Sequence, residues 1–205
     1  MTMATATATL SAILQLNQDA VILLEKGKYG EALRYFQLAL SNLTVSLRQM
    51  ESRSDGGDVD HPIAAVPILL LANTRDDEDN MFGPYMHAFT LFNFAMALHL
   101  RGLSEGKTAY LLKALKIYGM LDNSFQTRAL PDERGWKLLR LALWNNVGHI
   151  HSLHAHFEEV KVCIGHLREL LSQPLDLPLE DLVFFHNTVF HIDIFQTYAI
   201  FAPAA

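Results

Sequence analysis

The stretch WNNVGHIHSLHAHFEEV, residues 144–160, shows how this chain is built. Before it and through its first half, large apolar residues recur at helical spacing from about residue 131 to residue 153. A turn follows at residues 154–156, and a second periodic run extends over residues 157–171. Because helices joined by so short a connection lie antiparallel, the stretch predicts a helical hairpin.

Two earlier parts of the chain have the same organisation. Near residues 9–50, one periodic run stops at Gly27-Lys28 and a second begins at Tyr29. Near residues 84–120, the periodicity pauses at Arg101-Gly102-Leu103 and then resumes. With the third hairpin near residues 131–172, the pattern predicts an all-α fold, and an apolar run near residues 179–201 predicts a last helix that caps it.

Length and composition agree with one soluble domain over residues 1–205. The 205 residues are 50% hydrophobic, which suffices for one core, and glycine and proline are few, at 11 and 7. One cysteine, Cys163, excludes an internal disulfide framework and favours a reduced, intracellular and cytoplasmic location. We expect no signal peptide, since the N-terminus lacks a basic region, and no membrane span.

The net charge of -6 is concentrated in one segment. Residues 51–80 hold eight acidic and two basic side chains, so the rest of the chain balances to zero. We therefore expect this segment to be an acidic insertion between hairpins, and we expect no basic face for nucleic acid or for an anionic membrane. Within it, the apolar residues 62–71 could form a strand or an extended piece packed on the helices.

The third hairpin carries a recognisable motif. Trp144-x2-Val147-Gly148-x2-His151 resembles the opening W-x2-L-G-x2-Y of a tetratricopeptide repeat, and Ala32-x3-Phe36 matches the second half of that repeat in the first hairpin. In one common register the repeats run from residue 16 to 39, from 91 to 114 and from 144 to 167. The resemblance implies a right-handed α-α superhelix of about three hairpins plus the capping helix.

The same resemblance implies a function and a surface. In tetratricopeptide proteins the first helices of the hairpins line a concave groove that holds a peptide or a helix of a partner, so this chain would be a protein-binding scaffold or adaptor. Carried over by position, Gln18 and its neighbours would face that groove. The expected partner-binding residues are Asn17, Phe89, Phe92, Asn93, Met96, His99, Asn145, Asn146 and His149. Relatives that bind acidic C-termini use Lys and Arg in the groove, and these positions offer none.

Two alternatives stay open. The apolar last helix could join copies of the chain into a homo-oligomer, as in a self-associating structural subunit. The histidines at 149, 151, 154 and 156 could hold a metal, although neither H-E-x-x-H nor C-x2-C is present. Without a phosphate loop, dinucleotide fingerprint or nucleophile elbow, we expect no enzyme, no cofactor and no metal site.

Overall fold

The computed structural model describes residues 3–51, 82–127, 134–174, 182–186 and 189. These belong to two compact units, residues 1–127 and residues 128–205. Each unit is described by itself, and the expected single domain over residues 1–205 stays a prediction.

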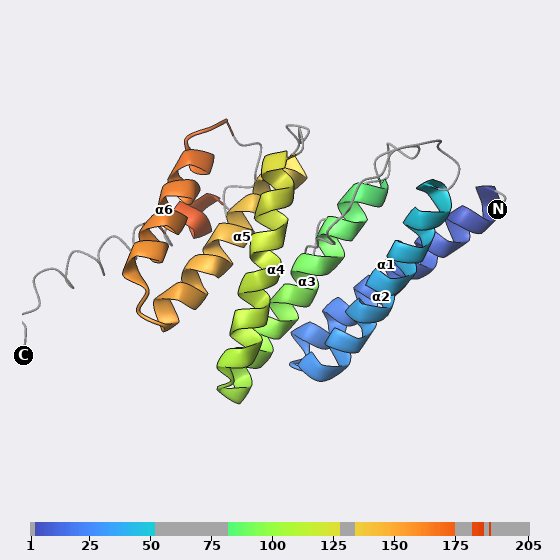
Figure 1. Ribbon diagram of the computed structural model, residues 1–205, viewed down its shortest axis with the longest axis horizontal. Helices are drawn as coiled ribbons and strands as arrows, with labels where there is room; N and C mark the ends of the chain where they lie inside the picture. Colours follow the sequence, from blue (N-terminus) through green and yellow to red (C-terminus); the bar gives the residue numbers. More distant parts are fainter. Residues whose placement is uncertain (1–2, 52–81, 128–133, 175–181, 187–188, 190–205) are drawn as a thin grey trace, which may run out of the picture. The chain divides into compact units, whose positions relative to one another are not determined.

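The fold is all-α, and the described residues contain no strand. Unit 1 holds α1 (Met3–Glu25), α2 (Tyr29–Glu51), α3 (Phe82–Glu105) and α4 (Thr108–Thr127). Unit 2 holds α5 (Arg134–Leu153), α6 (Phe157–Leu171) and the helical residues 182–186 (Figure 1). None of the described helices combines the length and the apolar content that crossing a bilayer needs. Most of the expected helix over residues 179–201 lies outside the described residues, and the segment 62–71 lies wholly outside them.

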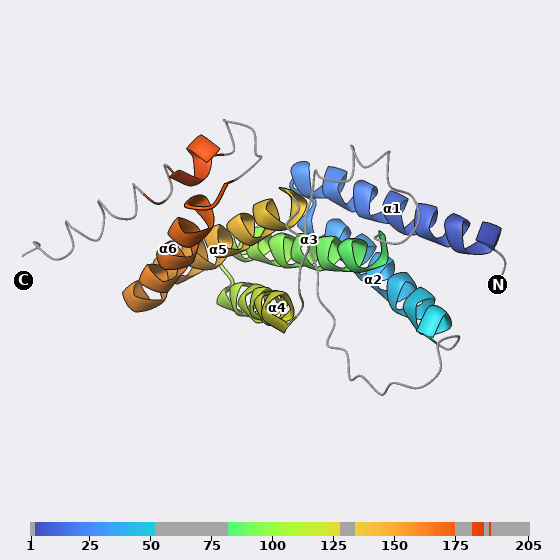
Figure 2. The same cartoon turned by 90° about the horizontal axis from the view of Figure 1, so that it is seen from above.

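In unit 1, α3 is the central helix. It packs against α2 and α4 and also touches α1, while α1 and α2 pair as a hairpin. Figure 2 shows α1 and α4 on opposite sides of α3. One buried cluster joins α1, α2 and α3 through Ile13, Ala39, Leu43 and Met86. Both α2 and α4 are therefore direct neighbours of α3.

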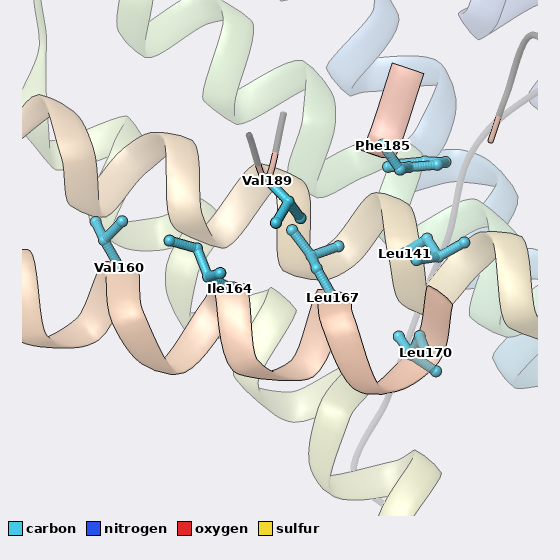
Figure 3. Close-up of a cluster of buried hydrophobic side chains, with 7 residues drawn as sticks. All are labelled: Leu141, Val160, Ile164, Leu167, Leu170, Phe185 and Val189. Atoms are coloured by element: carbon cyan, nitrogen blue, oxygen red, sulfur yellow. The ribbon is translucent and has the colours of Figure 1, made fainter. Parts of the chain in front are cut away.

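In unit 2, α5 and α6 form a hairpin around a buried cluster (Figure 3). Its members are Leu141, Val160, Ile164, Leu167, Leu170, Phe185 and Val189. Apolar residues of α6 at helical spacing face α5, which is the amphipathic pattern that the sequence shows. Phe185 and Val189, which fall within the expected capping helix, are members of this cluster, and the capping role stays a prediction.

All three hairpins turn in the same way. The first helix of each is followed, within two residues, by one residue in the left-handed conformation, namely Gly27 (φ 70°), Gly106 (φ 62°) and Ala155 (φ 54°). The next amide donates to the carbonyl oxygen five residues earlier, at 2.9, 2.9 and 3.0 Å. The left-handed residue itself donates to the carbonyl three residues earlier, which completes a Schellman motif. The hairpins are therefore structurally equivalent at their turns.

The turns correct the sequence register in the second hairpin. The left-handed residue comes eleven positions after Leu16 and eleven after Trp144, but fifteen after Leu91. Ala95, one helical turn after Leu91, precedes Gly106 by eleven positions and so corresponds to Leu16 and Trp144. The expected pause at residues 101–103 was wrong, since α3 continues to Glu105.

Gly102 explains that error. A Cβ on this residue would lie 2.6 Å from Leu111 Cδ2 and 3.2 Å from the Leu111 backbone nitrogen. Glycine is therefore present because α4 approaches α3 closely, and not because the chain turns.

Candidate functional site

The groove residues expected in unit 1 are mostly buried. Their exposed fractions are 1% for Asn17, 5% for Phe89, 0% for Phe92, 0% for Asn93 and 2% for His99, while Met96 is half-buried. Phe92 packs edge-on against Tyr118 of α4, with ring centroids 5.1 Å apart. In this arrangement these side chains contribute to packing between helices, and the surface that they offer a partner is small.

Asn17 and Asn93 are brought together. Asn93 Nδ2 donates to Asn17 Oδ1 at 3.3 Å, which links α1 to α3 across the inside of unit 1. Within the described part of the chain, Asn17 Nδ2 and Asn93 Oδ1 have no hydrogen-bond partner. A buried amide pair of this kind fixes how two helices sit together, because neither side chain can rotate without losing its bond.

The remaining groove residues lie on α5 of unit 2. Asn146 is 8% exposed, Asn145 is half-buried and His149 is exposed. Asn145 Nδ2 donates to Asn146 Oδ1 at 3.3 Å. The two groups of predicted residues thus belong to separate units, and one continuous groove through both stays a prediction.

The histidines cluster at the turn of the third hairpin. His151 Nδ1 lies 3.3 Å from His156 Nδ1, and the rings of His154 and His156 are 5.7 Å apart. Burial lowers the pKa of His151. Among the described residues, no three His, Cys, Asp or Glu side chains are placed to hold a metal ion together. The cluster therefore gives the alternative of a metal-binding protein no ligand set in the part of the chain that is described.

Cys163 lies against Gly148 at the α5–α6 contact. A Cβ on Gly148 would be 3.3 Å from Cys163 Cβ, so the glycine of the motif lets the two helices approach closely. The thiol is buried, and burial raises its pKa to about 12. A thiol that stays protonated is a poor nucleophile and a poor metal ligand, which agrees with a packing role.

The sequence did not reveal an open cleft in unit 1, with a volume of about 920 Å³. Side chains of α2, α3 and α4 line it, together with the turn before α2. It is lined by residues 27–31, Leu33, Arg34, Gln37, Phe94, Leu98, Arg101, Ser104, Glu105, Tyr110, Lys113, Lys116 and Ile117. Four of its lining side chains are aliphatic or phenyl groups, namely Leu33, Phe94, Leu98 and Ile117.

Charged side chains lie around Tyr110, a lining residue of this cleft. Glu105 accepts from Arg101 Nε at 2.6 Å and from Lys107 Nζ at 2.6 Å. The Arg101 guanidinium lies 4.6 Å from the centre of the Tyr110 ring, a cation–π contact. Hydrogen bonds from Lys107 and Arg101 lower the pKa of Glu105, and the bond to Glu105 raises the pKa of both cations. All three groups therefore stay charged.

The cleft carries an excess of positive charge. Its lining contains five basic side chains, Lys28, Arg34, Arg101, Lys113 and Lys116, against two acidic ones, Glu31 and Glu105, for a balance of +3. Both acids are in ion pairs, since Glu31 lies 3.2 Å from Lys28. Arg34, Lys113 and Lys116 form no ion pair with any described residue. The zero balance of the chain outside residues 51–80 gave no hint of this local excess.

Only one signal in the sequence pointed to the cleft. Tyr110, Lys113, Lys116 and Ile117 follow helical spacing on α4, so that they share one face. Which residues stand opposite them depends on how α2 packs on α3.

Comparison of the chain with protein-family models, with curated proteins and with solved structures finds no match.

Proposed function

We propose that this chain is a scaffold or adaptor that binds a segment of a partner protein, and that the cleft of unit 1 is its docking surface. The observation that carries the proposal is the cleft itself, an open concave surface lined by both apolar and charged side chains. Peptide segments bind such surfaces through apolar anchors and polar contacts along their length. The alternative surface, made of the amide and aromatic residues of α1 and α3, is mostly buried.

The chemistry of the cleft also supports binding over catalysis. Its lining has no histidine, cysteine or aspartate. Of its two carboxylates, Glu105 has a lowered pKa and Glu31 is paired with Lys28. The general acid or base that most often works near neutral pH is a histidine, and this lining contains none.

The form of the cleft favours a polypeptide over a small molecule. Sites for small molecules are enclosed and surround most of the ligand. This cleft opens to solvent along three helices. A buried apolar cluster joins α2 to α3, and the contact of Phe92 with Tyr118 joins α4 to α3. A surface of this kind needs little rearrangement to receive an extended or helical segment, which lowers the cost of binding.

Site-specific photo-crosslinking in the native cell tests the proposal. A photoreactive amino acid replaces Gln37, an exposed cleft residue of α2, in one variant, and Gln18, an exposed residue of α1 on the predicted groove face, in a second. Both sites are exposed glutamines within helices, so the two substitutions are matched. Covalent adducts are identified by mass spectrometry after irradiation.

We expect protein adducts from position 37 that are missing from position 18. Adducts from position 18 alone would move the docking surface to the α1 face and refute the cleft. If neither position captures a protein, the adaptor function itself fails.

A further inference from the structure

The charged side chains of the cleft indicate what its partner must carry. Arg34 stands on α2, and Lys113 and Lys116 stand on α4, so that cations come from two of the lining helices. None of the three is neutralised by a described carboxylate. Cations held near one another repel, and an anionic partner relieves that repulsion.

The apolar lining adds a second requirement. Leu33 and Leu98 are 7% and 6% exposed, whereas Phe94 and Ile117 are half-buried and still offer apolar surface to the cleft. An apolar side chain seated there would remove this surface from water. Carboxylates on either side of that side chain would then reach the cations of α2 and α4.

We infer that the cleft takes an acidic polypeptide segment in which Asp or Glu side chains flank an apolar anchor. This inference rests on the proposed function and names the chemistry of its partner. The site differs from the groove expected from the sequence, which has no Lys or Arg and lies on α1, α3 and α5. Here the cations come chiefly from α2 and α4, the second helices of their hairpins.

A nucleic acid fits this surface less well than an acidic segment does. Glu31 and Glu105 lie within the cleft and would repel a continuous row of phosphates. The chain as a whole has a net charge of -6, which opposes the approach of a long polyanion. A segment with spaced carboxylates can place them beside the cations and away from these two acids.

The test is a binding titration of the full chain with a short synthetic peptide. The labelled probe carries Glu and Asp residues on both sides of a central Leu-Phe pair, and fluorescence anisotropy follows its binding. One control peptide has Gln and Asn in place of the acids, and a second has Ser in place of the Leu-Phe pair. We expect binding of the acidic probe alone, with an affinity that falls as the salt concentration rises.

Matched charge variants locate the binding site. Lys113→Gln with Lys116→Gln removes two cleft cations. Lys26→Gln with Lys161→Gln removes the same number of exposed cations outside the lining, of which Lys161 is paired with Glu158. The first pair should weaken binding about fivefold, the effect of losing two exposed ion pairs, and the second should leave it within about twofold. Equal losses in the two double variants would overturn the inference, because net charge would then account for both.

A further experiment tests whether the chain's own acidic residues affect binding of the probe. Asp76, Asp77, Glu78 and Asp79 could compete with the probe, so the titration is repeated after all four are replaced by their amides. Absence of binding in both forms would overturn the inference. Tighter binding of a single-stranded oligonucleotide than of the peptide would overturn it too, in favour of a nucleic acid.

The two proposals fail separately. Adducts from position 37 without binding of the acidic probe would leave the adaptor function standing and refute the acidic partner. If the chain bound the probe but captured no protein in the cell, the preference of the cleft for acidic peptides would stand and the adaptor function would be refuted.

Discussion

Gly102→Ala tests the close approach of α3 and α4, on which the geometry of the cleft depends. In a helix, alanine is favoured over glycine by about 1 kcal/mol. At position 102, however, the added methyl group would meet Leu111 Cδ2 at 2.6 Å, Leu111 Cγ at 2.9 Å and the Leu111 backbone nitrogen at 3.2 Å. Overpacking of this kind costs about 1–3 kcal/mol. Because the backbone nitrogen cannot move away as a side chain can, we expect a net loss of about 1 kcal/mol in the free energy of unfolding.

Gly119→Ala is the matched control. Gly119 is an exposed residue of α4 in the same unit, and a methyl group there would have no neighbour within 4 Å. This variant should gain about 1 kcal/mol from helix propensity alone. The difference between the two variants, about 2 kcal/mol, therefore measures the steric cost at position 102, since the propensity term is common to both.

Urea denaturation followed by circular dichroism measures both variants. With a slope of about 2 kcal/mol per molar urea, the two midpoints should lie about 1 M apart, with Gly102→Ala below the wild type and Gly119→Ala above it. If Gly102→Ala raised the midpoint as much as Gly119→Ala does, α3 and α4 would not be in the close contact described. The assignment of Gly102 to packing would then be refuted.

Three further predictions concern the hairpin turns and Cys163. Ala155 adopts φ 54°, which costs a residue with a Cβ about 1 kcal/mol, so Ala155→Gly should raise the free energy of unfolding by about that amount. Gly27→Ala should lower it by a similar amount, because Gly27 is also left-handed. If urea titrations showed both variants changing the free energy of unfolding in the same direction, the turn geometry would be contradicted. Cys163 should react slowly with a thiol reagent at pH 8 in the folded chain and rapidly in urea, since burial raises its pKa to about 12. The unfolded thiol loses its proton near pH 9 and the folded one only near pH 12, so the unfolded state binds fewer protons between these two values. The free energy of unfolding should therefore fall as the pH rises from 9 to 12, and it should fall less in Cys163→Ala.

The secondary structure could be predicted because it depends on local patterns. The apolar spacing along each helix, together with Gly27 and its neighbours, sufficed to place the first hairpin, since helix periodicity and turn residues act over a few positions. The third hairpin followed from the same signals, and its turn at residues 154–156 was confirmed. The all-α fold class is thus a property of the sequence pattern.

The second hairpin shows where local patterns mislead. Gly102 looks like a turn residue in the sequence, but it lies inside α3 and is required by Leu111 of the neighbouring helix. The true turn is at Gly106, four residues later. A glycine required for packing and a glycine required for a left-handed backbone are the same letter, and only the contact between helices separates them.

The candidate site depended on tertiary structure to a greater degree. Sequence resemblance chose residues on α1 and α3, yet Asn17 and Asn93 turned out to be joined inside unit 1, with 1% and 0% of their surfaces exposed. Which polar residue is buried depends on all the neighbours that surround it, including those far away along the chain. The groove prediction named side chains correctly placed on first helices, but position on a helix does not determine exposure.

By itself, the sequence determined the helices, two of the three turns and the total charge, because each of these is either local or a simple sum. Only the tertiary structure decided where that charge gathers. Arg34 of α2 and Lys113 of α4 are far apart along the chain, and they line one cleft because both helices pack against α3. Charge that cancels along the chain need not cancel in space, since the electrostatic interaction depends on distance between groups and not on their order in the sequence.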